Sequence, residues 1–399
     1  MNARNILSYL RQYQTSDLFG YLVGTLLWHM MAMLICCFFF ILMVVRFIQA
    51  TRFSKLHIPQ EGGKMEDSLM VIYPFRDEAD LIPISLPALI SNFSEIPNSR
   101  LVLVDSASKD NGPDIAKEIL SKSNLDPNCW TLISAKSPGK SKALNHAMSE
   151  YDGTGIVAMV DADATIGQGS LKKIRSYFAN PEIGAVSALE SVDTRHPMSQ
   201  YKKRSNLLRK YESLGGSCFV LEGSLLAWHP LRINLRSFDE NSNADDAQIA
   251  MSAIRSGFMS IVHPSIEFED TRKKEGNVMR RSVRRSQGLS SQLIKNLDLL
   301  WSAPNKNART NFFYNIILHI FIPWCVLMLM LIPLFLAPSF YTDQSDLLGY
   351  SVIGPSCVML VSLISKTGRA LFFGSFCSVV GHTRALLGIR ANVWNPGRG

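Results

Sequence analysis

One stretch near the amino terminus restricts what this chain can fold into more than any other. Residues 21–45 contain no Asp, Glu, Lys or Arg, and these about 25 residues exceed the roughly 20 that a helix needs to cross a bilayer core. The stretch is longer than the apolar region of a cleaved signal peptide and continues directly into Arg46. We therefore expect a transmembrane helix over residues 21–48, after an N-terminal segment of residues 1–20.

Two more apolar stretches predict further membrane spans, at residues 312–338 and 347–365. Basic residues lie before the first and after the second, whereas the connection between them is acidic. This positive-inside pattern predicts an integral membrane protein whose large middle segment is cytoplasmic. Residues 370–389 are apolar but include His382 and Arg384, and a charge near the bilayer midplane is costly. We favour an interfacial or re-entrant helix there; a fourth crossing is the alternative.

The overall composition agrees with a folded membrane protein. Of the 399 residues, 47% are hydrophobic and 19% are charged, which excludes a disordered chain. The seven cysteines include no C-x-x-C pair, so neither a thiolate metal site nor a disulfide framework is expected. A short tail, residues 390–399, ends the chain.

The middle segment, residues 68–302, predicts an α/β domain. Short apolar runs alternate with amphipathic stretches of helical length, a pattern typical of a parallel sheet covered by helices. The candidate strands are residues 69–73, 101–104, 130–133 and 156–160.

Polar clusters follow three of these four strands, at residues 74–78, 105–110 and 161–163. In open α/β sheets ligands bind beyond the carboxyl ends of the strands. We therefore expect the three clusters to line one crevice.

Acidic residues at one strand end predict a metal site. Asp161 and Asp163 follow the strand at 156–160, and two carboxylates at this spacing can hold a hard cation that also takes diphosphate oxygens and water. Mg²⁺ or Mn²⁺ fits this chemistry best. His263 is a candidate for a further metal or diphosphate contact, with a structural role as the alternative.

The stretch at residues 137–145 contains Gly139, Lys140 and Ser141 but is not a Walker loop, because Ser134 occupies the position of the first glycine. It is better explained as the start of a helix whose amino terminus and lysine face a phosphate.

Six motifs in order resemble those of the membrane-bound, inverting family 2 glycosyltransferases. They are VIYPFRDE, LVLVDSASKD, GKSKALN, VDADA, LEGSLLAW and ADDAQIAMSAIRSGF, and they cover most of residues 68–302. The resemblance implies the GT-A fold, a Rossmann-like, mostly parallel sheet with helices on both faces. Transmembrane and interfacial helices would be added to it.

The same resemblance implies roles for individual residues. Asp246, with Asp245 beside it, would supply the general base that takes the proton of the acceptor hydroxyl. Asp161 and Asp163 would bind the donor diphosphate through Mn²⁺ or Mg²⁺. The residues expected to bind the nucleotide sugar are Pro74, Arg76, Glu78, Asp105, Lys140 and Asp161.

A basic helix is expected over about residues 272–300, just before the second membrane span. Such clusters bind anionic headgroups at about 1 kcal/mol per residue. The sharper alternative is that some of them bind the phosphate of a lipid-linked acceptor; the candidates are Arg281, Arg284, Arg285 and Gln287. Nucleic acid fits worst, because the basic residues lie at the bilayer without interleaved aromatic residues.

The resemblance implies a membrane-bound enzyme that moves one sugar from a nucleotide-sugar donor, expected to be a UDP-sugar, to a lipid-linked or glycolipid acceptor. The Q-x-x-R-W motif of processive synthases is absent after Gln287, where the sequence reads QGLSS. A processive polysaccharide synthase and a non-catalytic nucleotide-sugar-binding membrane partner remain the alternatives. The sugar, the nucleotide base, the acceptor and the oligomeric state are left open.

Overall fold

A computed structural model describes residues 31, 33–53, 68–191, 199–271, 278–336 and 364–389. The chain divides into two compact units. The smaller comprises Met1–Val45 and Phe321–Phe376, and the larger comprises Arg46–Ile320 and Cys377–Gly399.

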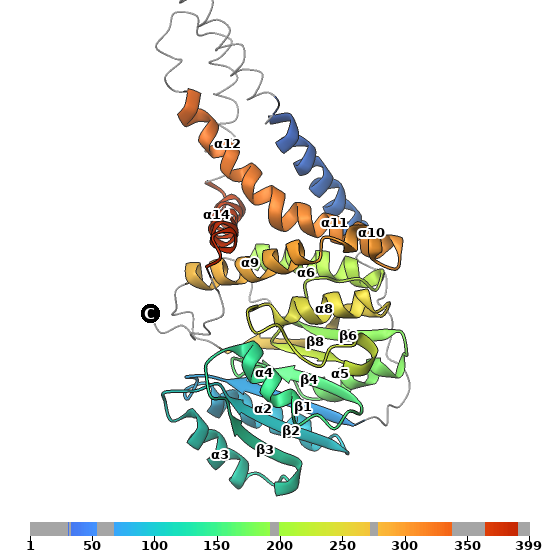
Figure 1. The fold of residues 1–399 in the computed structure, drawn as a ribbon, viewed down its shortest axis with the longest axis vertical. Helices are drawn as coiled ribbons and strands as arrows, with labels where there is room; N and C mark the ends of the chain where they lie inside the picture. Colours follow the sequence, from blue (N-terminus) through green and yellow to red (C-terminus); the bar gives the residue numbers. More distant parts are fainter. Residues whose placement is uncertain are drawn as a thin grey trace, which may run out of the picture. The chain divides into compact units, whose positions relative to one another are not determined.

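The larger unit is built around one mixed sheet of eight strands in the order β3-β2-β1-β4-β7-β6-β8-β5 (Figure 1). The strands β1 to β4 pair in parallel, whereas β7 runs antiparallel to both β4 and β6. The strands are β1 Leu69–Phe75, β2 Ser99–Asp105, β3 Trp130–Ser134, β4 Ile156–Val160, β5 Ala164–Ile166, β6 Ile183–Glu190, β7 Leu225–Trp228 and β8 Met259–Asp270.

The first four strands confirm the sequence prediction, with bounds that differ by at most two residues at either end. Every residue of β1 and β4 is buried, and continuous apolar runs are what a parallel sheet covered on both faces requires. The strands β5 to β8 were not predicted, although they form the other half of the sheet.

Helices cover both faces of the sheet, as expected for the GT-A fold. Apolar residues of α2, α3 and α5 pack on one face, and those of α4, α7 and α8 pack on the other. These helices are α2 Ile82–Ser94, α3 Gly112–Lys122, α4 Lys140–Met148, α5 Ser170–Ser176, α7 Pro230–Ile233 and α8 Asp245–Arg255. Short 3-10 turns, Pro127–Cys129 and Tyr177–Ala179, lead into β3 and follow α5.

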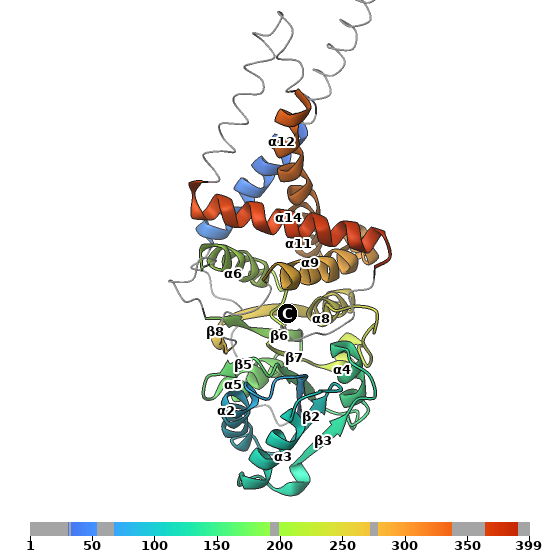
Figure 2. The same cartoon turned by 90° about the vertical axis from the view of Figure 1, so that its left-hand side faces the viewer.

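A further group of helices packs on the side of α8 that faces away from the sheet. A third apolar cluster joins α8 to the helices that follow β8, and Figure 2 shows α6 and α9 side by side beyond the sheet. The basic helix expected over about 272–300 is observed as α9 Val278–Lys295. Its neighbours are α6 Ser199–Leu214, α10 Leu299–Ser302 and α11 Lys306–Ile316.

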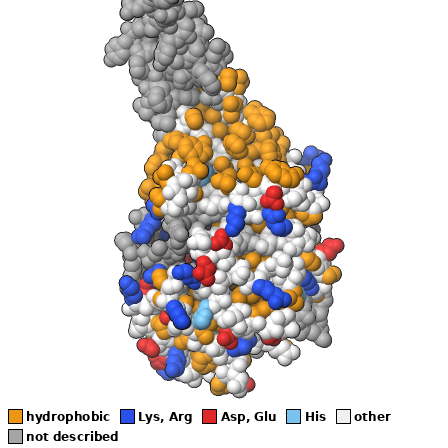
Figure 3. Space-filling view, viewed as in Figure 1, with side chains coloured by type: hydrophobic (Ala, Val, Ile, Leu, Met, Phe, Trp, Pro, Cys, Tyr) orange, Lys and Arg blue, Asp and Glu red, His pale blue; other side chains and the backbone are white. Residues whose placement is uncertain are grey.

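Two helices, Met33–Arg52 and Lys306–Leu329, are long and apolar enough to cross a membrane by length and composition. The second consists of α11, a π-helical turn Ile317–Phe321 and part of α12 Ile322–Leu336. Figure 3 shows Lys, Arg, Asp and Glu side chains on the surface of the larger unit. In the smaller unit, Leu34, Phe38 and Ile41 are exposed.

The structure describes only part of the other segments that were predicted to lie in or at the membrane. Residues 21–30 of the first expected span and 347–363 of the third lie outside the described residues. The helix expected at 370–389 is observed as α14 Lys366–Leu386.

Candidate active site

The loops after β1 and β2 are joined by hydrogen bonds. The carboxylate of Asp77 accepts a bond from the backbone N–H of Lys109 (2.6 Å), and the N–H of Asp77 donates to the hydroxyl of Ser108 (3.0 Å). Both loops contain a non-glycine residue in the left-handed region, Asp77 at φ 49° and Ala107 at φ 58°. Such conformations cost free energy and concentrate at functional sites.

The predicted nucleotide-binding residues of these loops lie at this edge of the sheet. Pro74 belongs to β1, and Arg76 and Glu78 follow it with exposed fractions of 7% and 2%. Asp105 ends β2, is 7% exposed and accepts a hydrogen bond from the N–H of Ser108 (2.9 Å). The charge of Glu78 also acts on the buried Tyr73 in β1.

Lys140 is the first residue of α4 and is held next to the end of β2. Gly139, which caps the helix at φ 148°, donates from its N–H to the buried Ser106 hydroxyl (3.0 Å). The Lys140 ammonium lies 2.8 Å from Asp161 Oδ1 and 3.1 Å from Asp245 Oδ2. Burial disfavours the ammonium, but these two carboxylates outweigh it and raise the pKa of Lys140.

Asp161 follows β4 directly. Its N–H donates to the carbonyl of Ser224 (3.0 Å), which joins it to the chain before β7. Burial raises the pKa of Asp161 to about 6; Lys140 opposes this shift, while the charges of Asp163 and Asp245 add to it. Negative charge therefore accumulates at this strand end.

Asp245 and Asp246 begin α8, where the helix dipole favours acidic residues. Burial raises the pKa of Asp246 to about 7, and the neighbouring charges of Asp245 and Glu222 act in the same direction. A side chain added at Gly223 would have its Cβ 3.6 Å from Lys140 Nζ and 3.7 Å from Asp246 Cβ. Residues from four separate segments thus meet around Lys140.

His263 has partners of its own in the described structure. Its ring lies 4.6 Å from that of Tyr177, centroid to centroid, and its Nδ1 lies 2.5 Å from the Ser265 hydroxyl. Burial lowers its pKa to about 4, and Lys173 and Lys210 act in the same direction. Within the described part of the chain, no group of three or more His, Cys, Asp or Glu residues could hold a metal. The role of His263 as a further metal or diphosphate contact stays a prediction.

The carboxylates alone do fit a divalent cation that arrives with a phosphate ligand. Asp161 Oδ1 and Asp245 Oδ2 are buried and face the Lys140 ammonium at 2.8 Å and 3.1 Å. Mg²⁺ is commonly bound by one or two carboxylates together with substrate phosphates. Asp161 and Asp163 can supply these carboxylate ligands.

The residues proposed for the acceptor phosphate lie on α9 in different environments. Arg285 is exposed, Arg281 and Arg284 are half-buried, and Gln287 is 4% exposed. The Gln287 amide donates to the carbonyl of Ile389, just after α14. Gln287 therefore joins α9 to the chain after α14, whereas Arg285 is available at the surface.

Sequence reasoning missed Glu222 and Arg209. Glu222 precedes Gly223 and pairs with Arg209 of α6. Glu222 lies in LEGSLLAW, one of the six motifs, to which no residue role was assigned; an acidic residue next to a glycine was the available signal.

A family comparison matches residues 70–225 to the model described as glycosyl transferase family 2. Residues 70–225 are therefore similar to this family, and the match supports a glycosyltransferase. A search of curated protein sequences finds no significant match.

Two solved structures are similar to this chain to different degrees. A mannosyltransferase from Pyrobaculum calidifontis, described in complex with GDP-Man and Mn²⁺, is 22% identical, with a TM-score of 0.76 over 90% of this chain and 99% of that one. TarS of S. aureus in complex with UDP is 15% identical, with a TM-score of 0.45 over 79% and 91% of the two chains. The first likeness supports the GT-A fold along most of the chain.

Proposed function

We propose that this glycosyltransferase moves one sugar, with inversion, from a nucleotide-sugar donor to a lipid-linked or glycolipid acceptor at the cytoplasmic face of a membrane. The observation that carries the proposal is the contact of Lys140 with both Asp161 and Asp245, next to Asp246. A buried cation among carboxylates is suited to a donor that brings both negative charge and a metal ion.

The donor side of the site would be formed by the loops after β1 and β2 and by the start of α4. Asp105 is our candidate for contact with the base, with Pro74, Arg76 and Glu78 beside it. Lys140 would neutralise charge that develops on the leaving nucleoside diphosphate. A related fold has been described with GDP-Man and another with UDP, so both nucleotide classes belong in the test.

Asp161 and Asp163 would hold Mn²⁺ or Mg²⁺ together with the donor diphosphate. The bound cation supplies electrostatic stabilisation of the leaving group. The structure described with GDP-Man also contains Mn²⁺, which supports this choice.

Asp246 would accept the proton of the acceptor hydroxyl. Its raised pKa, about 7, suits a base that works near neutral pH. Asp245 is held by Lys140 at 3.1 Å, so Asp246 is the better placed of the pair to exchange a proton with the acceptor.

The membrane part of the proposal rests on the two long apolar helices and on the basic face of α9. Arginines at 281, 284 and 285 would bind lipid headgroups or the phosphate of the acceptor.

The test is incubation of the detergent-solubilised protein with UDP-, GDP- and dTDP-sugars, Mn²⁺ and native lipid extract, followed by mass spectrometry of the lipids. One added hexose mass on a lipid is the expected product. Long polymer would support a processive synthase instead, and no sugar transfer or donor hydrolysis would support a non-catalytic partner.

A further inference from the structure

Two side chains of α6 bind the segment that connects this helix to the site. Arg209 donates from Nε to the carbonyl of Val220 (2.9 Å) and forms an ion pair with Glu222. One helical turn further along, Glu212 accepts a hydrogen bond from the N–H of Phe219 (3.4 Å). One face of α6 therefore holds this segment at three successive points.

The segment that α6 binds ends at the acceptor side of the site. The N–H of Glu222 donates to the Ser187 hydroxyl (3.0 Å), and the next residue, Gly223, abuts Lys140 and Asp246. The charge of Glu222 acts on Asp246, so the two carboxylates are close enough to interact. The Arg209–Glu222 pair is itself mostly buried, with side-chain exposures of 16% and 18%.

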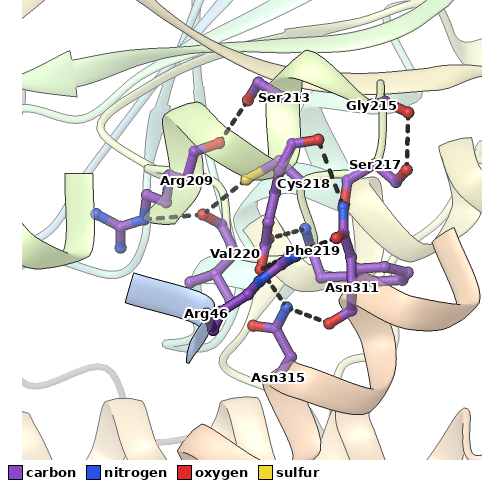
Figure 4. A network of polar contacts seen from close by, with 11 residues as sticks. Arg46, Arg209, Ser213, Gly215, Ser217, Cys218, Phe219, Val220, Asn311 and Asn315 are labelled. Atoms are coloured by element: carbon purple, nitrogen blue, oxygen red, sulfur yellow. Dashed lines mark hydrogen bonds and ion pairs between the residues drawn. The ribbon is translucent and has the colours of Figure 1, made fainter. Parts of the chain in front are cut away.

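The helix that holds this segment is itself anchored by a buried polar network (Figure 4). Glu212 is 7% exposed and accepts a hydrogen bond from the Asn315 amide (2.7 Å). Arg46 lies 4.0 Å from the same carboxylate and also donates to Asn311. These contacts join α6 to α11 and to the helix Met33–Arg52.

The Arg46 guanidinium also lies over two aromatic rings, 4.4 Å from the centroid of Tyr211 and 4.7 Å from that of Tyr314. Burying an ion pair gives little net stability, because desolvation offsets the attraction. Such a network does fix geometry, and it gives Arg209 a rigid base.

We propose that Arg209 is a positioning residue for glycosyl transfer: from the anchored helix α6 it holds Glu222, and with it the Gly223 turn, against the general base Asp246. This inference rests on the proposed function and adds two residues to its acceptor side. The charged groups that act on Asp246 are Asp245, Glu222 and Lys140.

The experiment compares Arg209→Gln, Arg209→Lys and Glu222→Gln in the full-length solubilised protein. Arg204→Gln is the matched control, because Arg204 is an exposed arginine on the same helix. The probe is undecaprenyl phosphate with the donor that the wild type uses. The readouts are KM for this acceptor, nucleotide binding, and the pH dependence of kcat/KM.

Arg209→Gln should raise KM for the acceptor about tenfold and leave nucleotide affinity unchanged. It should move the acidic limb of the profile up by about half a pH unit, because the Glu222 charge is no longer neutralised beside Asp246. Glu222→Gln removes that charge and should move the limb down. Arg209→Lys should restore most of the wild-type profile.

Shifts of opposite sign separate positioning from a general loss of packing, which would not move the limb in two directions. Shifts of the same sign, or variants that behave like Arg204→Gln, would overturn the inference. The proposed function would still be supported if the wild type is active. A wild type that transfers sugar neither to undecaprenyl phosphate nor to any lipid of a native extract would overturn both. If Arg209→Gln does not fold, Arg209→Lys and Glu222→Gln give the decision.

Discussion

Charge at the site is unevenly distributed among individual residues. Asp161, Asp163, Asp245, Asp246 and Glu222 all contribute to the electrostatics around Lys140. Burial, and after it the charges of the neighbouring carboxylates, raises the pKa of both Asp161 and Asp246. The site is thus prepared for a ligand that brings positive charge with it.

The first prediction concerns the base. Burial raises the pKa of Asp246 to about 7, and a base acts only when ionised, so kcat/KM should rise with pH through about 7. Asp246→Asn should lower turnover by about a thousandfold and spare nucleotide binding. Radiolabelled transfer and equilibrium binding check this; near-normal turnover in the variant would remove the assignment.

The second prediction concerns Lys140. Lys140→Gln leaves the carboxylates of Asp161 and Asp245 without their buried cation, so donor affinity should fall at least about tenfold. Titration with UDP or GDP in the presence of Mn²⁺ measures the loss. Lys142→Gln is the control, because Lys142 reaches only the Ser137 hydroxyl in the described contacts (3.1 Å). Equal affinities in the two variants would argue against a role in donor binding.

Residue patterns predicted some of these positions and missed others. Asp161 was identifiable because an acidic residue directly after a strand has a short list of uses, whereas Asp246 was identified through the resemblance of its motif to the family. Arg46 was identified only as the basic residue after an apolar stretch, whereas it is 4% exposed in a network with Glu212. Partners this far apart in sequence leave no local signal.

At the scale of elements, the strands with continuous apolar runs were predictable, because a buried parallel strand needs no other pattern. The other half of the sheet, β5 to β8, was not. β8 changes from buried residues to exposed ones along its length, and β7 has only four residues. Neither shows the clean period that indicates a strand.

A third prediction tests how α9 packs beside the loop before α8. A Cβ at Gly288 would lie 2.1 Å from Asn243 Oδ1, so Gly288→Ala should destabilise the protein by about 1–3 kcal/mol. Gly374→Ala, in the middle of α14 with nothing within 4 Å, should be neutral or slightly stabilising. Thermal unfolding in detergent compares them; equal midpoints would show that α9 packs differently.

The fourth prediction tests helix packing within the smaller unit. The Cys36 thiol lies 3.9 Å from the Cys325 carbonyl and interacts with the Cys325 side chain. Mild oxidation with copper phenanthroline should therefore link Cys36 to Cys325. The exposed neighbour Cys37 is the internal control. Disulfide-linked peptides identified by mass spectrometry check this, and a Cys37–Cys325 link would contradict the packing.

At the scale of the whole molecule, the chain contains a GT-A fold and apolar helices that are long enough to span a bilayer. Both the sequence and the structure support the fold and the apolar helices, because each is indicated by a pattern over many residues rather than by single residues. The donor and acceptor depend on a few side chains, and for that reason no pattern in the sequence identified them.

A fifth prediction follows for membrane association. Spanning helices are released by detergent, whereas a protein bound only through the basic face of α9 is released by salt. We expect the chain to remain in the membrane pellet in alkaline carbonate and in high salt, and to dissolve in detergent. Release by salt alone would show peripheral binding. Immunoblotting of the fractions is sufficient.

The central claim is that Asp161, Asp163 and Asp246 meet one divalent ion and one donor. Anomalous diffraction from the protein with Mn²⁺ and its donor tests this most directly. We predict one manganese peak that contacts Asp161 or Asp163 and the donor diphosphate, with the Asp246 carboxylate on the opposite face of the sugar. A peak at another position, or a donor bound away from Lys140, would contradict the account.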